Sequence, residues 1–282
     1  MNKYMRRGPL FFLLGLLVLT ACRDKELDMT VRNKTLFEGA EWTVIEAQDA
    51  WNVVVVQDDG PSYVELEYSA FLEEYLLVTK QSNTLAIELT QRVYCPSNTV
   101  KTAVVHMPSV ERFLFIDAVT ASLQGNFSGA TLRLDGAATC KGGHFSGETS
   151  LKLGGASKMV DLDFNGTSCL LEVDDASTFK GTLTASTMLT VKADNASWVT
   201  TYGGYAPLAS VDVKAASSVN MLSTEVEEMT ITMTSAATAS VNVTETLHGT
   251  LRDASSLYYY DGPDLDIDKD TTSILSPLTI NL

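Results

Sequence analysis

The feature that most constrains this chain is a motif that returns every 18 to 20 residues through its second half. The motif places alanine after a turn-forming residue, as in "LDGAATC", "VDDASTF" and "ADNASWV". Eight alanines follow one another at spacings of 19, 19, 20, 20, 20, 20 and 18 residues: Ala118, Ala137, Ala156, Ala176, Ala196, Ala216, Ala236 and Ala254. Such regularity is typical of stacked structural repeats, and a scattered set of active-site residues has no reason to have it.

The residues on either side of each alanine predict how one repeat folds. Apolar residues stand five and three positions before it with a polar residue between them, as in Leu171-Glu172-Val173. An alternation of apolar and polar residues with a period of two is typical of a β-strand with one buried face. A second apolar column lies three positions after the alanine: Ala121, Cys140, Met159, Phe179, Val199, Val219, Ala239 and Leu257. The residue before the alanine is mostly Asp, Asn or Gly, which tolerate tight turns, so Asp175 is interpreted as a corner residue.

A repeat of 20 residues cannot bury its own apolar face, but stacked repeats share one core. The chain is therefore predicted to be all-β, a parallel β-helix of about eight coils over residues 111–260, about 34 Å long at the usual strand spacing. Residues 36–110 lack the repeat but alternate in "WTVIEA" and "YVELEY", which predicts a β-rich N-terminal cap region. From Leu257 onward "LYYYDGPDLDIDKD" breaks the period, so residues 261–282 are expected to form a C-terminal cap.

The first residues have the layout of an export signal. Basic residues precede a short apolar run from Leu10 to Leu19, which is far below the roughly 20 residues that span a bilayer. Residues 1–21 are thus a signal peptide, and "LTAC" resembles the lipobox of bacterial lipoproteins, in which Cys22 is lipidated. Residues 22–35 then form the lipidated cysteine and a tether. An ordinary secretory signal with an incidental cysteine is the alternative. We expect a protein of the cell envelope that contacts the membrane through its lipid, and the outer membrane is favoured by analogy with other lipoproteins.

Charge and cysteine content exclude several kinds of ligand. Removal of residues 1–21 takes away three of 20 basic residues and none of 35 acidic ones, which leaves a net charge of −18. A field of that sign repels nucleic acid, so no nucleic-acid partner is expected. Cys95, Cys140 and Cys169 have no C-x-x-C spacing and predict neither a zinc site nor a complete disulfide framework, although one bridge is possible. At least one of them is expected to pack as a small buried hydrophobe.

Catalysis is the main alternative, because β-helices also include polysaccharide lyases and hydrolases. Asp135, Asp174 and Asp194 share one outward column, but acids are common at turns for backbone reasons, so solvated corner acids are favoured over a cation site. The three histidines occupy unrelated positions and no catalytic motif occurs. We expect no catalytic residues, no metal and no cofactor. A cleft that holds two acids, or an acid beside a base, would favour the enzyme.

Three aromatic residues are the expected ligand-binding site. Trp198 stands two positions after its alanine, where the other coils carry Thr, Ser or Lys, so it is predicted to face solvent. Tyr202 and Tyr205 flank Gly203-Gly204 in the same coil, where the strand is expected to bulge. Exposed aromatic side chains of this kind stack on sugars or contact proteins, so the expected ligand is a glycan or an extracellular protein. The alternative is that Trp198 folds back onto its own rod or a cap.

Over roughly residues 36–275 the chain resembles the head-GIN-domain family of auto-transporter adhesins. The resemblance rests on "WNVVVVQDDG", on the small-residue unit after L-x-L, and on "YYYDGP". Family coils tend to read Ser-Gly-Ala-Gly, and here only Gly136 and Gly155 keep the glycine before alanine. The resemblance implies an exported β-helix with a non-catalytic binding or adhesive role. A glycan-processing enzyme and a structural envelope protein are the alternatives.

Overall fold

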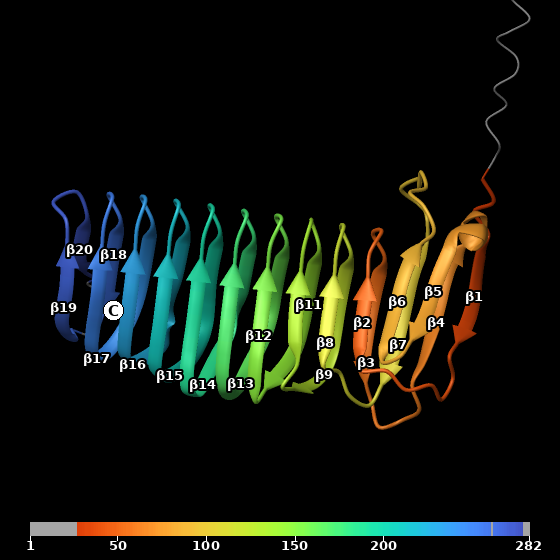
Figure 1. The fold of residues 1–282 in the computed structure, drawn as a ribbon, viewed down its shortest axis with the longest axis horizontal. Helices are drawn as coiled ribbons and strands as arrows, with labels where there is room; N and C mark the ends of the chain where they lie inside the picture. The colour runs from red at the N-terminus through yellow and green to blue at the C-terminus, as the bar shows by residue number, and fades with distance from the viewer. Residues whose placement is uncertain (1–26, 261, 279–282) are drawn as a thin grey trace, which may run out of the picture.

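The computed structural model describes residues 27–260 and 262–278. Its strands belong to one continuous sheet wound into a rod, with the tight turns aligned along one edge (Figure 1). The parallel β-helix predicted from the repeat is confirmed. One short 3-10 helix, η1 (Ala70–Tyr75), interrupts the strands near the N-terminal end.

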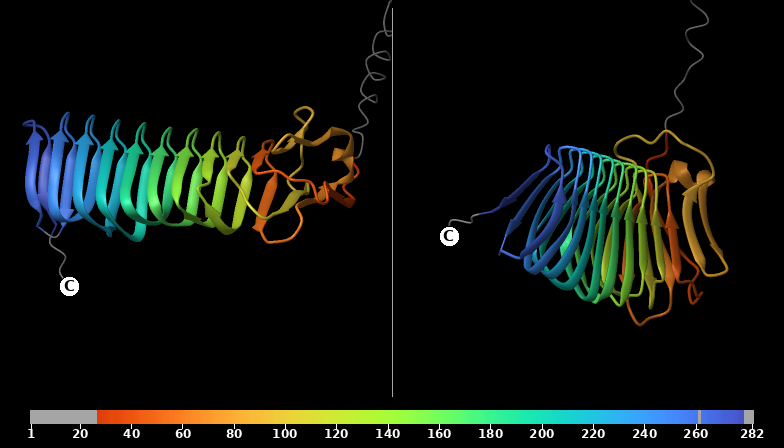
Figure 2. Two further views of the ribbon diagram at one scale, coloured as in Figure 1. Left: turned by 60° about the horizontal axis from the view of Figure 1, so that its bottom comes forward. Right: turned by 60° about the vertical axis from the view of Figure 1, so that its left-hand side comes forward.

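Each coil has one strand that enters its tight turn and one that leaves it, and equivalent strands stack in two parallel ladders (Figure 2). The pre-turn ladder contains β6 (Thr84–Leu89), β2 (Val44–Ala47), β8 (Arg112–Phe115), β10 (Thr131–Leu134), β12 (Glu148–Leu153), the second halves of β13 (Lys158–Val173), β14 (Thr178–Ala193), β15 (Trp198–Val213), β16 (Ser218–Met233) and β17 (Thr238–Leu251), and β19 (Asp264–Lys269). The post-turn ladder contains β7 (Lys101–Met107), β3 (Asn52–Gln57), β9 (Thr120–Ser128), β11 (Thr139–Ser146), the first halves of β13 to β17, β18 (Ser256–Tyr260) and β20 (Ile274–Pro277).

The tight turns have the same backbone in nearly every coil. In the coil of Asp174, both central residues are left-handed, with φ of 53° at Asp175 and 61° at Ala176. The Ser177 N–H donates to the Asp174 carbonyl at 3.1 Å, which closes a type I′ turn. Coils without glycine keep this geometry, including the Ala215-Ala216 pair with φ of 49° and 59°. The loss of the family's glycine therefore leaves the corner unchanged.

Successive turns are also bonded to each other. The Ala176 N–H donates to the carbonyl of Asn195 in the next coil at 2.9 Å, and Ala196 donates likewise to Ala215. The same bond starts from Ala50, Ala156, Ala216 and Ala236. Since an isolated type I′ turn leaves this N–H without a partner, the bond ties these six coils directly to their neighbours.

The core fills the space between the ladders. The rings of Phe113, Phe127 and Phe145 pack together with centroids 5.0–6.3 Å apart, and the apolar columns on either side of the turns are buried. Burial of each Phe, Leu, Ile, Val or Met side chain stabilises the fold by about 1.5–3 kcal/mol. A column that the repeat did not indicate lies directly after the alanine, where serines are buried in five coils: Ser157, Ser177, Ser197, Ser217 and Ser255.

The three cysteines of the described residues are free, so they form no disulfide. Cys140 and Cys169 are buried in the core, as expected of small hydrophobes, and Cys95 is half-buried. Burial raises the pKa of the Cys169 thiol to about 12, which keeps it protonated and unreactive.

The coils at the N-terminal end of the rod do not stack in the order of the sequence. Residues 44–57 make a coil with the repeat's turn, in which Asp49 and Ala50 have φ of 63° and 57°. This coil lies between the β6–β7 coil and the β8–β9 coil, although β6 and β7 follow it in sequence. Three antiparallel strands complete this end: β1 (Val31–Leu36), β4 (Tyr63–Ser69) and β5 (Leu76–Gln81).

Candidate functional site

Trp198 begins β15 and faces solvent, with 49% of its surface exposed. In the post-turn ladder its neighbours in register are Thr178 on β14 and Ser218 on β16. The outward direction predicted from the repeat is therefore correct, and Trp198 does not fold back into the core.

Tyr202 is pushed outward by a bulge in the same strand. Thr201 pairs with Gly181 and Gly203 pairs with Thr182, so Tyr202 is the extra residue and is 55% exposed. The backbone beyond it needs glycine: Gly204 has φ of +129°, and a Cβ there would lie 1.9 Å from the Leu183 carbonyl oxygen. The bulge predicted from Gly203-Gly204 is thus present.

Tyr205 has different surroundings from the other two aromatic residues. It is half-buried at the bend, opposite Glu225 in register, and its hydroxyl donates to the Glu227 carboxylate. That hydrogen bond, with burial and the charges of Glu227, Glu225 and Glu245, raises the pKa of Tyr205. The outer face of β15 therefore carries Trp198 and Tyr202 as exposed aromatic groups, while Tyr205 is held by acids. Leu208, which the repeat did not single out, is also exposed on this strand.

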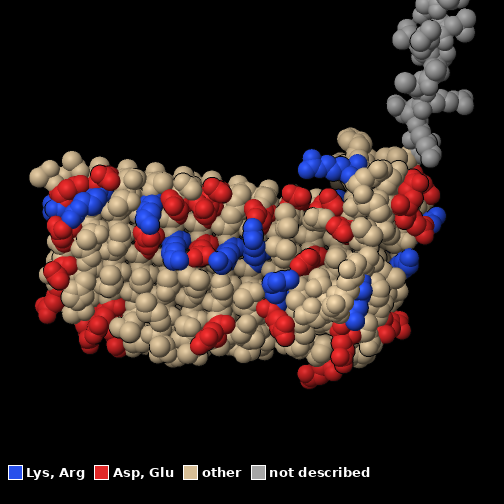
Figure 3. Space-filling model, viewed as in Figure 1, with Lys and Arg blue, Asp and Glu red and all other residues tan. Residues whose placement is uncertain are grey.

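A groove of about 540 Å³ lies on the other ladder, under the row of turns. On this face of the rod Lys and Arg are interleaved with Asp and Glu (Figure 3). The lining residues come from β10, β12, β13, β14, β15 and the adjoining turns: Arg133, Leu134, Asp135, Lys152, Leu153, Gly154, Glu172, Val173, Asp174, Asp175, Lys192, Ala193, Asp194, Asp212 and Lys214.

The basic residues in the groove are paired with its acids. Glu172 lies between two lysines of adjacent coils, 2.7 Å from the Lys152 Nζ and 2.9 Å from the Lys192 Nζ. Lys152 and then Lys192 hold the pKa of Glu172 below its usual range. Arg133 contacts Asp135 at 2.9 Å, and Lys214 pairs with Asp212. The groove thus carries a ladder of ion pairs across five coils.

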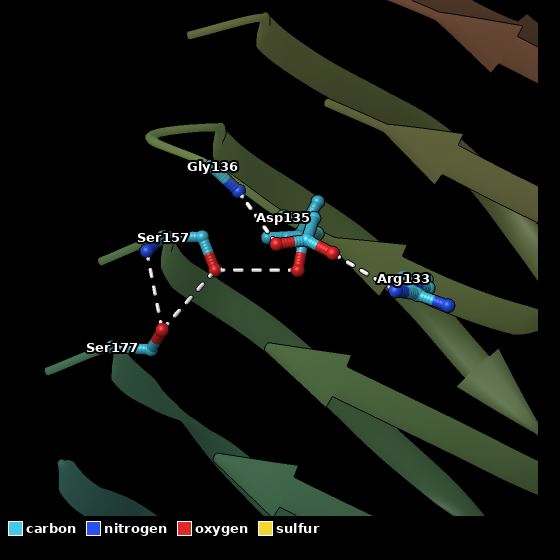
Figure 4. Close-up of polar contacts among 6 residues, drawn as sticks. Arg133, Asp135, Gly136, Ser157 and Ser177 are labelled. Carbon is cyan, nitrogen blue, oxygen red and sulfur yellow. Dashed lines mark hydrogen bonds and ion pairs between the residues drawn. The ribbon is translucent and has the colours of Figure 1, made fainter. Parts of the chain in front are cut away.

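The aspartates of the corner column accept hydrogen bonds from the turns. Asp135 accepts a hydrogen bond from the Gly136 N–H at 2.8 Å while its other oxygen accepts from Arg133 (Figure 4). Asp174 accepts from the Asp175 N–H and from the Asn195 amide, both at 2.8 Å. These contacts support the interpretation as corner acids. Within residues 27–260 and 262–278 no three His, Cys, Asp or Glu side chains are grouped so as to hold a metal ion.

All three histidines contact aspartates, which their sequence positions did not indicate. Nδ1 lies 2.8 Å from Asp58 in His106, 3.0 Å from Asp163 in His144, and 3.3 Å from Asp266 in His248. Two of these pairs join residues in register on adjacent coils, where the two sequence positions differ by one repeat. The repeat could have indicated these contacts, because its spacing places Asp163 beside His144 in the next coil.

A family model described as "Putative auto-transporter adhesin, head GIN domain" matches residues 41–263. The chain belongs to this family. The match covers the β2–β3 coil as well as the repeats, and it confirms the resemblance seen in the sequence. No curated protein matches the chain.

Solved structures share the fold of this head GIN domain protein at low sequence identity. A "putative adhesin" from Parabacteroides merdae has a TM-score of 0.66 at 10% identity, over 89% of this chain and 97% of that one. A "putative adhesin" from Parabacteroides distasonis has a TM-score of 0.63 at 12% identity, over 89% of this chain and 98% of that one. A "putative lipid binding protein" from the same species has a TM-score of 0.59 at 11% identity, over 90% of this chain and 98% of that one. At such identity the likeness shows the fold alone.

The Glu172 ion pairs predict a pH-dependent contribution to stability. Because its pKa is lower in the folded chain than the roughly 4.3 of an unfolded glutamate, the contribution is present above that pH and is lost as the pH falls through the folded value. In an NMR titration of its carboxyl carbon, Glu172 should titrate below an ordinary glutamate. Lys152→Met should raise its pKa, and Lys158→Met, on the other ladder, should not. An ordinary value in the wild-type protein would contradict the pairing.

Proposed function

We propose that this protein is a lipid-anchored β-helix of the cell envelope with a non-catalytic binding or adhesive role. The observation that carries the proposal is the exposed pair Trp198 and Tyr202, presented by one strand of a rigid rod whose other outward columns are mostly small and polar. Binding energy concentrates in a few aromatic anchors, so these side chains are the expected contact for a glycan or an extracellular protein. The family description as an adhesin agrees with this role.

The anchor is proposed from the sequence, because Cys22 lies outside the described residues. The first described residues run beside η1: the Ala70 N–H donates to the Thr30 carbonyl at 2.8 Å and the Phe71 N–H to the Asp28 carbonyl at 2.9 Å. A lipid on Cys22 would therefore hold the N-terminal end of the rod near the membrane. No described helix is both long enough and apolar enough to cross a bilayer.

A glycan-processing enzyme is the second candidate, and the groove is the observation that favours it. The groove places acids beside basic residues, as a lyase or hydrolase site would require. Against this, Glu172 accepts from two lysines and its pKa is lowered, which suits neither a general acid nor a strong base. Binding is therefore favoured over turnover, and ligand screens should measure both.

Replacement of Cys22 by alanine tests the anchor. In cells that express the full chain, Cys22→Ala should abolish labelling by a fatty-acid analogue and release the protein from membranes, because no other acylation site is expected. Cys95→Ala is the control and should leave labelling unchanged. Labelling that persists in Cys22→Ala would contradict the proposed anchor.

Replacement of Trp198 by alanine tests the binding surface. Residues 27–282 should first be screened against glycans and extracellular proteins, with turnover assayed alongside. Because Trp198 is half exposed, Trp198→Ala should change the free energy of unfolding by well under the roughly 3–5 kcal/mol expected for a buried tryptophan. It should nevertheless weaken binding to the ligand that the screen identifies.

Two controls make this test specific. Thr178→Ala changes the same column one coil away and should leave binding intact. Trp51→Ala removes a fully buried indole and should cost the full 3–5 kcal/mol in urea unfolding. Equal loss of stability in Trp198→Ala and Trp51→Ala would contradict the proposed contact surface. Undiminished binding by Trp198→Ala would contradict it as well.

A further inference from the structure

The C-terminal end of the rod has two edge strands. Among the described residues β19 pairs only with β17, and β20 pairs only with β18. Both lie at the end of the rod opposite β1 (Figure 1). A strand at such an edge presents unpaired N–H and C=O groups, which can bind another extended segment.

The two ends of the rod differ in how their last layer is closed. At the N-terminal end, Arg32 and Lys34 of β1 are exposed and stand in register with the buried Tyr68 and Leu66 of β4, on the same side of the sheet. Charged side chains on an edge strand, Lys above all, are a known way to disfavour further strand pairing. The N-terminal edge is therefore protected by its own sequence.

The C-terminal layer is apolar on its core side. Leu265 of β19 continues the column of the buried Leu247 and is 43% exposed, and Ile267 follows it half-buried. Leu275 of β20 is also half-buried and packs against the core. Lys269, the one charge on this side of β19, donates to the Ser273 carbonyl of the neighbouring loop. Another strand added here would bury Leu265 and Ile267.

The outer side of β19 is acidic. Asp264, Asp266 and Asp268 alternate with the apolar residues, in register with Thr246, His248 and Thr250 of β17. The side chains of Asp266 and Asp268 are 86% and 73% exposed. A strand paired with β19 would carry its outward side chains directly beside this row.

The edge is held in place before any partner arrives. Asp270, directly after β19, accepts hydrogen bonds from the backbone N–H of Asp253 at 2.7 Å, of Thr272 at 3.0 Å and of Ser273 at 2.8 Å. The Asp253 N–H above all, with these further donors, holds the pKa of Asp270 well below its usual range. A fixed edge loses little conformational freedom on binding.

From the open edge, its apolar side and its acidic side together, we infer that β19 docks an extended segment of a partner protein that carries Lys or Arg on alternate residues with apolar residues between them. Two copies of this chain cannot pair well here. A two-fold pairing of β19 with itself is antiparallel and sets Asp264, Asp266 and Asp268 against the same residues of the second copy, where like charges repel. A basic segment meets complementary charge instead.

This inference deepens the proposed binding role. It rests on the proposed lipid anchor, which would place the edge away from the membrane. With the N-terminal end held at the membrane by Cys22, β19 lies at the far end of the rod. The docking edge is separate from Trp198, which belongs to the post-turn ladder several coils away.

The test uses two synthetic peptides, Lys-Val-Lys-Ile-Lys-Val-Lys and its counterpart with Glu at every Lys position. Residues 27–282 should bind the basic peptide and not the acidic one, measured by fluorescence anisotropy. The double variant Asp264→Lys/Asp266→Lys should weaken binding of the basic peptide at least tenfold and gain binding of the acidic peptide. The basic peptide with alternate amides N-methylated along its pairing edge should lose binding, because the ladder hydrogen bonds are removed.

A matched control separates the edge from the overall negative charge. Glu65→Lys/Glu67→Lys makes the same change on β4, which is paired on both sides and so offers no edge. It should bind the basic peptide like the wild-type protein. Equal loss in the two double variants, binding of the N-methylated peptide, or a dimer in sedimentation that Asp264→Lys/Asp266→Lys dissociates would overturn the inference. Trp198→Ala should leave peptide binding unchanged, so failure at β19 is distinguishable from failure of the proposed aromatic surface.

Discussion

Two consecutive left-handed residues at the tight corner of most coils set the geometry of the rod. The left-handed conformation costs an L-residue roughly 1–2 kcal/mol, and Ala215-Ala216 adopts it twice in succession. The type I′ turn that results matches the twist of the strands it joins. Its alanine N–H then donates to the next coil, so the strained corner also contributes to stacking.

The functional surfaces follow from the fixed register that these turns impose. Every coil presents the same columns, so a residue that departs from its column acquires a distinct position on the surface. Trp198 is such a residue in the post-turn ladder, and the ion pairs around Glu172 arise because charged positions of successive coils stack within reach of each other. Among the described residues the columns end with β19 and β20, and β19 pairs on one side only.

The repeat allowed the fold and the outward position of Trp198 to be predicted, because both depend on position within a coil. The coil of residues 44–57 was not predicted, because Ala118 follows Ala50 only after 68 positions instead of about 20, and Trp51 stands where many later coils have serine. The Tyr205–Glu227 contact and the Glu172 ion pairs depend on side-chain direction between coils. The spacing of the repeat fixes which residues are neighbours but not which of them meet.

Amide hydrogen exchange at the turn alanines tests most directly whether the stacked turns hold the rod together. Ala176, Ala216 and Ala236 are exposed, yet each donates its N–H to the next coil. Measured by NMR on residues 27–282, these amides should exchange as slowly as those of the flanking strands. Exchange at the rate of a free turn would mean that the coils are stacked by their strands alone, and would contradict the role given to the left-handed corner.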